Sequence, residues 1–156
     1  MLRRLSALVT AAAAVATATV ASAGGPAAAA TPPPTPCATS SVVVRIDGLA
    51  FDPASVPAGG TSTATLAATN CTGQSRTISE TWVGRFLSGT STGIPAGCPV
   101  IDPLPRSVTF APYAQVSTAG SYLVLAGCTA DRLRLTVTLS QGGVQLASRT
   151  ADLLIG

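Results

Sequence analysis

The side chains that this chain lacks limit the chemistry open to it. The sequence contains no histidine, and all nine of its basic residues are arginines. No histidine or lysine is therefore present to act as the base that would activate a serine nucleophile. General acid–base catalysis would need two neighbouring carboxylates, but the six acidic residues are scattered along the chain: Asp47, Asp52, Glu80, Asp102, Asp131 and Asp152. We expect a protein that is not an enzyme.

Four cysteines are the other residues with distinctive chemistry. Cys37, Cys71, Cys98 and Cys128 follow one another at intervals of 27 to 34 residues. A zinc site would need close C-x-x-C pairs or histidine partners, whereas an even number of cysteines in an exported chain is typical of disulfides. The sequence predicts two disulfides, no metal site and no other cofactor.

A few side chains are candidates for contact with a ligand or partner. Exposed aromatics can bind sugar rings or flat molecules, and Tyr113, in an expected turn, is the best candidate because the core should take most of the others. Arg132 and Arg134 alternate with threonines and form a second candidate surface, with a solvated sheet face as the alternative.

Glu80 stands two residues before the only tryptophan, Trp82. Both residues fall on the same side of an expected strand, so the carboxylate is expected beside the tryptophan. An ion pair with Arg76 or Arg85 would account for Glu80 without a functional role.

The first 36 residues read as export and spacer sequence. A basic start precedes an apolar run from Leu5 to Val20, and Ala-Ser-Ala at 21–23 has the form of a signal-peptidase site. The run is too short and too alanine-rich for a comfortable membrane span. We expect residues 1–23 to be a cleaved signal peptide and residues 24–36 an extended linker rich in Ala, Pro and Thr.

The net charge of the mature chain limits the classes of partner that it can bind. Seven arginines, the nine of the full chain less two in the signal peptide, stand against six acids. A nearly neutral chain lacks the basic stripe of a nucleic-acid-binding protein and the polybasic patch of a membrane-surface protein. We expect a secreted bacterial monomer that does not bind nucleic acid or insert stably into a membrane, with an extracellular protein or glycan as its partner.

The strongest secondary-structure signal runs from Asp131 to Ile155. Leucine or valine occupies every second position from Leu133 to Leu139, the period of a half-buried strand. The glycine pair at 142–143 can adopt the positive φ of a hairpin turn. Apolar residues then change phase along the second strand, which predicts a bulge between Ala147 and Thr150.

Five further strands are expected before this hairpin, and a long loop spans Gly89–Pro105. The strands are Ser41–Asp47 with a continuation to Phe51, Thr61–Asn70, Arg76–Leu87, Ser107–Phe110 and Gln115–Ala126. No segment shows helical periodicity, so seven strands joined by turns predict one antiparallel two-sheet domain over residues 37–156. In a Greek-key sandwich, Cys37 and Cys71 lie at one end and Cys98 and Cys128 at the other, which favours these two pairings.

Two stretches resemble known families. FDPASVPAGGTSTATLAATN resembles the opening of bacterial immunoglobulin-like domains, with a Pro-Gly turn before a threonine-rich strand that ends in asparagine. The resemblance implies a seven-stranded, antiparallel immunoglobulin-like Greek-key β-sandwich. RIDGLAFDPASVPAGG is similar to the first strands of cupredoxins, but their copper site needs histidines that this chain lacks.

The expected function is that of a secreted, non-catalytic immunoglobulin-like domain that acts through surface contacts at or outside the cell envelope. One alternative is a small-ligand or carbohydrate binding protein, since carriers of the neocarzinostatin type are similar in size and composition, although their local cysteine spacing is absent here. Such a carrier requires an apolar cleft. Another alternative is an inhibitor of an extracellular hydrolase that presents the Gly89–Pro105 loop.

Overall fold

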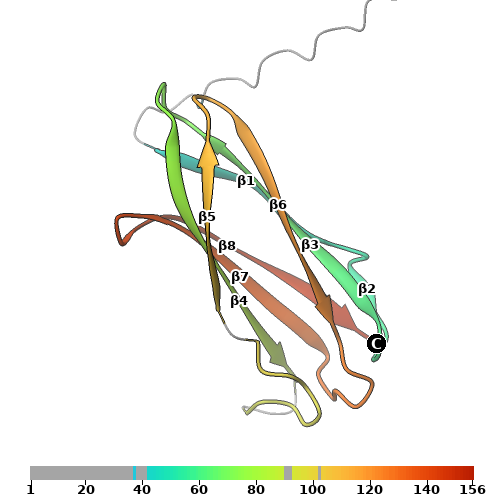
Figure 1. The fold of residues 1–156 in the computed structure, drawn as a ribbon. Helices are drawn as coiled ribbons and strands as arrows, with labels where there is room; N and C mark the ends of the chain where they lie inside the picture. Colours follow the sequence, from blue (N-terminus) through green and yellow to red (C-terminus); the bar gives the residue numbers. More distant parts are fainter. Residues whose placement is uncertain (1–36, 38–41, 90–92, 102) are drawn as a thin grey trace, which may run out of the picture. The chain divides into compact units, whose positions relative to one another are not determined.

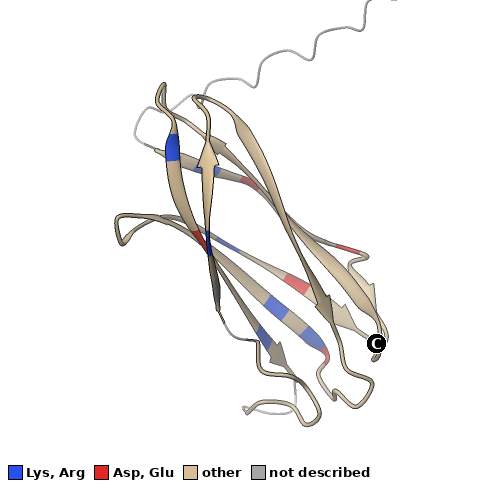
Figure 2. Ribbon diagram, viewed as in Figure 1, with Lys and Arg blue, Asp and Glu red and all other residues tan. Residues whose placement is uncertain are grey.

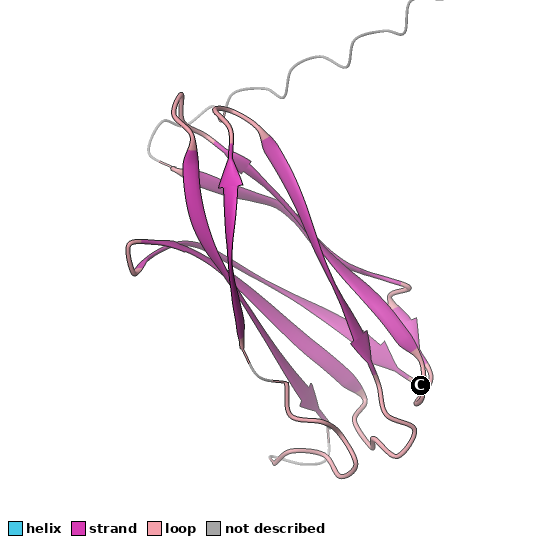
Figure 3. Ribbon diagram, in the orientation of Figure 1, coloured by secondary structure: helices cyan, strands magenta, loops and turns pink. Residues whose placement is uncertain are grey.

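The computed structural model describes residues 37, 42–89, 93–101 and 103–156. Every regular element in these residues is a β-strand (Figure 3). No helix able to cross a membrane is found in this part of the chain. The expected signal peptide and linker, over residues 1–36, lie outside the described residues and stay predictions.

The strands form two sheets (Figure 1). The three-stranded sheet has the order β1-β3-β6 and the five-stranded sheet the order β2-β8-β7-β4-β5. The bounds are Val44–Asp52 for β1, Ser55–Val56 for β2, Thr61–Asn70 for β3, Arg76–Leu87 for β4, Leu104–Phe110 for β5, Gln115–Leu123 for β6, Arg132–Gln141 for β7 and Val144–Ile155 for β8. All pairings are antiparallel except that of β2 with β8.

The all-β, two-sheet prediction is confirmed, but the expected seven antiparallel strands are not what the chain forms. Beyond β1 the chain crosses to the other sheet, where the two residues of β2 pair in parallel with Leu154 and Ile155. A strand of two residues is too short to leave a periodic signal in sequence. Strand β1 also passes Gly48 without a break, because a register shift between Ile46 and Gly48 absorbs one residue.

The core lies between the inner faces of the sheets. The apolar side chains of β7 expected on one face, at Leu133, Leu135, Val137 and Leu139, are fully buried. Strand β3, in the opposite sheet, contributes the buried side chains of Ala64, Leu66 and Ala68. In these two strands, the alternation that predicted the strand also identified the side that faces the core.

The bulge in the final hairpin lies earlier than expected. Leu139 pairs with Ala147 and Ser140 with Gln145, so Leu146 is the extra residue of β8. The tight turn, with positive φ at Gly142 and Gly143, fixes the start of the pairing, and the phase change occurs three residues into the strand. Leu153 is buried, and Leu146, Ala147, Ala151 and Ile155 pack against the core, whereas Val144 is 64% exposed. The expected position between Ala147 and Thr150 was wrong, since the phase change alone does not say which residue is extra.

Two disulfides connect the ends of the strands. Cys37 is bonded to Cys71 and Cys98 to Cys128, with Cα atoms 5.3 and 4.3 Å apart. These are the two pairings that the topology favoured. Their presence indicates an oxidising environment for the protein.

Asp47 connects the three strands of the smaller sheet. Its carboxylate on β1 accepts hydrogen bonds from Arg45 Nε at 2.7 Å and from Gln115 Nε2 of β6 at 2.8 Å, and a third, short one from Thr69 Oγ1 of β3. Burial opposes ionisation, but the hydrogen bonds from Thr69, Gln115 and Arg45 prevail and lower the pKa of Asp47 below its usual value of 3.8.

We expect Asp47→Asn to destabilise the protein at pH 7 by about 1 kcal/mol, because an amide is a weaker acceptor than the carboxylate. A lowered pKa in the folded state stabilises the protein above the unfolded pKa, and this stabilisation is lost as pH falls through the folded pKa. Urea unfolding from pH 7 to pH 2.5 should therefore show the two proteins converging below about pH 4. Asp52→Asn, at an exposed position of the same strand, is the control; a difference independent of pH would contradict the prediction.

Candidate ligand-binding cleft between the sheets

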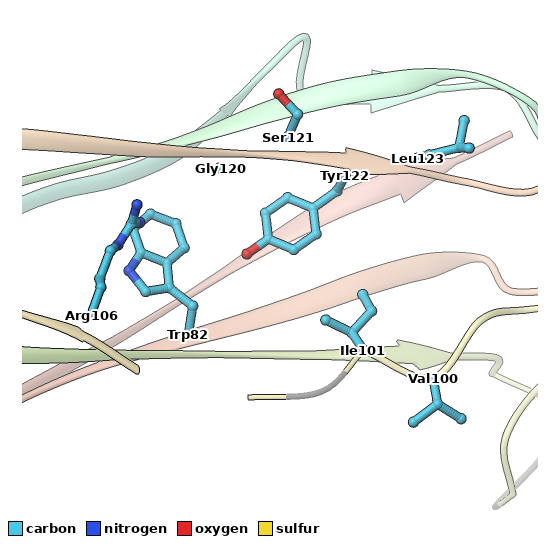
Figure 4. A pocket seen from close by; sticks show the side chains of 8 residues that line it. All are labelled: Trp82, Val100, Ile101, Arg106, Gly120, Ser121, Tyr122 and Leu123. Atoms are coloured by element: carbon cyan, nitrogen blue, oxygen red, sulfur yellow. The ribbon is translucent and has the colours of Figure 1, made fainter. Parts of the chain in front are cut away.

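A cleft opens between two strand edges. Strand β5 is an edge strand of the five-stranded sheet, and β6 is an edge strand of the three-stranded sheet. The two strands are not paired with each other. They lie close together near the turn that joins them and diverge toward the start of β5 and the end of β6 (Figure 1). A cavity of about 670 Å³ lies on this side, lined by Trp82, Val100, Ile101, Arg106, Gly120, Ser121, Tyr122 and Leu123 (Figure 4).

Two aromatic rings from opposite sheets face this cavity. Trp82 projects from the inner face of β4 and is 4% exposed, and the half-buried Tyr122 projects from β6 toward it (Figure 4). Tyr122 also packs edge-on against Phe51, with ring centroids 5.8 Å apart. Gly120, two residues before Tyr122 on β6, has no side chain and so leaves space beside the tyrosine ring. A Cβ added at Gly120 would lie 3.6 Å from that ring and would occupy part of this space.

A buried carboxylate binds two of the residues that line the cleft. Glu80, 1% exposed, accepts three hydrogen bonds at Oε2: from Trp82 Nε1 at 3.2 Å, from Arg106 Nε at 3.1 Å and from Thr118 Oγ1 at 2.9 Å. Trp82 shares β4 with Glu80, whereas Arg106 lies on β5 and Thr118 on β6 of the other sheet. The charge of Glu80 is thus compensated by Arg106, and its hydrogen bonds join the two sheets.

Arg106 has three roles at this position. It forms the ion pair with Glu80, its guanidinium carbon lies 4.4 Å from the ring centroid of Trp82, and its Nη1 donates to the Ala119 carbonyl of β6 at 3.1 Å. The cation–π contact holds the indole on one side. The bond to Ala119 bridges the two strand edges and limits the cleft there.

Two polar groups on residues that line the cleft have no hydrogen-bond partner among the described residues. The hydroxyl of Tyr122 is directed toward Trp82 (Figure 4) and makes no hydrogen bond to that part of the chain, nor does Nη2 of Arg106. Burial raises the pKa of Tyr122, and the positive charge of Arg106 offsets this in part. Both groups are hydrogen-bond donors, so they are suited to binding a ligand oxygen.

The contact candidates expected from sequence lie elsewhere. Tyr113 is 49% exposed in the turn between β5 and β6 and adopts a positive φ of 54°. Arg134 makes two 2.8 Å hydrogen bonds to Asp152 on the outer face of the five-stranded sheet. Arg132 lies 3.9 Å from Asp131. None of the three expected contact residues lines the cleft.

Charged residues are few and dispersed over the described strands (Figure 2). In the same ranges no group of three or more histidine, cysteine, aspartate or glutamate side chains is placed to hold a metal ion.

The sequence placed Glu80 beside Trp82, but the other residues of the cleft were missed because no local signal marks them. Glu80 pairs across strands with Arg106, rather than making an ion pair with Arg76 or Arg85 as expected, and this pairing depends on the register of β4 and β5. Tyr122 begins a continuous apolar run to Leu125, which has no period that identifies the inner face. A tryptophan with an acid two residues away was the one available signal.

Comparisons with known proteins concern the fold alone. No protein-family model matches the chain, and no curated protein matches its sequence. A solved structure of the Pseudomonas fluorescens alkylpurine DNA glycosylase AlkC, bound to DNA containing an abasic site analog, matches 72% of this chain with a TM-score of 0.51 and 14% identity. The sporulation control protein Spo0M of Bacillus subtilis matches 72% of the chain with a TM-score of 0.48 and 12% identity. The match spans 31% of the glycosylase and 49% of Spo0M, so this chain is similar to one part of each.

Proposed function

We propose that the protein is an exported, non-catalytic binding protein of immunoglobulin-like fold that holds its ligand in the cleft between β5 and β6. The observation that carries this proposal is the 670 Å³ cavity into which Trp82 and Tyr122 project from opposite sheets. Mostly apolar cavities of this size with a few polar groups are typical of small-ligand sites. The three hydrogen bonds of Glu80 favour a structural role over a catalytic one.

The fold assignment is supported by strand order and core composition. Strands β1, β3 and β6 alternate along the chain with β4, β5, β7 and β8 of the other sheet, so the connections pass repeatedly between sheets. Trp82 lies in the core opposite a strand of small residues, an arrangement common in immunoglobulin-like sandwiches. The two disulfides support export into an oxidising compartment.

The outer face of the larger sheet is a weaker candidate for binding. Its polar side chains already bind one another across strands. The hydroxyl of Thr136 lies 3.0 Å from that of Thr150, and the hydroxyl of Thr138 lies 3.3 Å from that of Ser148. Arg134 forms an ion pair with Asp152. A ligand there would have to displace these bonds, whereas the Tyr122 hydroxyl and Arg106 Nη2 in the cleft have no partner in the described chain. This difference favours the cleft.

Trp82, the only tryptophan of the chain, makes the proposal testable by fluorescence. We expect small aromatic compounds with an oxygen acceptor, such as N-acetylphenylalaninamide and 2-naphthoate, to change its emission saturably. Gly120→Val should weaken this binding at least about tenfold, because the added methyl groups occupy the space beside Tyr122.

Ser117→Val is the matched control, since this side chain is exposed on the opposite face of the same strand and does not line the cavity. Both variants should keep the circular dichroism spectrum of the native protein. Equal binding by the two variants, or no saturable change with any compound, would reject the cleft as the binding site.

A further inference from the structure

The side of β6 that faces the cleft is an open strand edge. Backbone N–H and C=O groups of one residue point to the same side of a strand, and those of the next residue to the other side. Val124, just after β6, bonds Gly59 and Gly60 on the β3 side, at 2.8 and 2.9 Å. The Ala119 carbonyl instead accepts from Arg106 on the opposite side.

The same alternation assigns the backbone of Ser121 and Leu123 to the cleft side. Both residues line the cavity, yet Figure 4 shows the Ser121 side chain directed away from Trp82. Leu123 is 52% exposed. They therefore contribute two N–H and two C=O groups to the cleft wall, and among the described strands none pairs with β6 on that side. Unpaired edge groups of this kind accept an added strand.

We infer that the ligand is an extended peptide segment that pairs with β6 at Ser121 and Leu123 and inserts an apolar or aromatic side chain between Trp82 and Tyr122. This inference rests on the proposed function of the cleft. Side chains of an added strand alternate, so one of them would enter the space above Gly120 while its neighbours point outward. The added strand would extend the three-stranded sheet to four strands.

The bridge from Arg106 to Ala119 determines where pairing can begin. It occupies the edge of β6 just before Ser121, so the peptide can pair only from Ser121 toward the end of the strand. A free aromatic molecule could contact Trp82 and Tyr122 but would leave the four backbone groups unpaired. A peptide satisfies both parts of the site, and this combination distinguishes it from a small molecule.

The ligand side of the test uses three tryptophan-free probes, with Trp82 emission as the readout. They are the peptide acetyl-Ser-Thr-Phe-Thr-Ser-amide, the same peptide with its backbone N-methylated at both threonines, and N-acetylphenylalaninamide. We expect the unmodified peptide to bind at least about tenfold more tightly than N-acetylphenylalaninamide, because it adds several backbone hydrogen bonds. N-methylation should abolish that gain, since it removes strand donors and keeps the phenylalanine side chain.

The protein side of the test uses Leu123→Pro and Leu123→Ala. Proline is tolerated where an edge N–H faces away from the sheet, and here it removes one donor from the cleft. Both variants remove the leucine side chain from the cavity wall, but only proline also removes the backbone donor. We therefore expect Leu123→Pro to bind the peptide about tenfold more weakly than Leu123→Ala does, and the two variants to bind N-acetylphenylalaninamide equally. Amide exchange of Ser121 and Leu123 should slow when the peptide binds.

The outcomes separate this inference from the proposed function. If all three probes bind equally and Leu123→Pro binds the peptide as tightly as Leu123→Ala does, strand pairing is wrong while the cleft remains a small-ligand site. If no probe changes Trp82 emission, both are wrong. Dimerisation of the free protein that Leu123→Pro abolishes would assign the β6 edge to a second copy and overturn the peptide assignment.

Discussion

Replacing Glu80 with leucine is expected to lower the free energy of unfolding by about 3 kcal/mol. The substitution leaves three donors, on Trp82, Arg106 and Thr118, without their common acceptor, and it leaves a guanidinium without its counter-charge. Removal of one partner of a buried ion pair typically costs about 3–5 kcal/mol. The lower end applies because the Arg106 side chain is 38% exposed and water can solvate part of it.

Chemical denaturation followed by Trp82 fluorescence and circular dichroism measures this loss. The double variant Glu80→Leu with Arg106→Met should recover a substantial part of it, because apolar side chains of similar volume can replace a buried ion pair at little cost. Asp152→Asn is the control, since its ion pair with Arg134 lies on the outer face and should affect stability little. If Glu80→Leu proves as mild as Asp152→Asn, the hydrogen bonds of Glu80 do not hold the sheets together.

Replacing both Cys98 and Cys128 with serine is expected to destabilise the protein by about 3–4 kcal/mol and to weaken ligand binding in the cleft. The disulfide joins positions 30 residues apart, a loop for which the chain-entropy model gives a stabilisation of this size. It also holds the segment that carries Ile101 over Gly84, where an added Cβ would lie only 2.7 Å from the isoleucine side chain. Without the disulfide, this wall of the cleft loses one of its attachments.

The second disulfide provides a matched control for the effect on binding. Cys37 and Cys71 are 34 residues apart, so replacing both with serine should cost a similar amount of stability. Cys71 follows β3 at the end where Thr69 pairs with Gln115, at the start of β6, whereas the cleft lies at the end of β6. Titration with N-acetylphenylalaninamide should therefore show weaker binding only for the Cys98 and Cys128 variant. Equal loss in both variants would mean that global stability, not the cleft wall, governs binding.

The strands could be predicted because their signal is local. The alternation of apolar and polar residues over Leu133–Leu139 and Thr61–Asn70 indicates which side chains are buried. The glycine pair after β7 indicates the turn. The disulfide pairing followed from strand direction, since an antiparallel sandwich brings successive loops to alternate ends. Strand β2 and the position of the bulge at Leu146 were beyond prediction, because each depends on one or two residues.

The sequence by itself determined that this chain forms two β-sheets and two disulfides, and that it lacks the histidine and lysine side chains of common catalytic sites. Only the tertiary structure decided that β5 and β6 remain unpaired edges, that Glu80 meets Arg106, and that Trp82 and Tyr122 face one cavity. The physical reason is that period and composition are properties of neighbouring residues, whereas a cleft arises from the register and spacing of strands far apart in the chain. Tyr122 and Trp82 are 40 positions apart in the sequence and meet only because two sheets pack face to face.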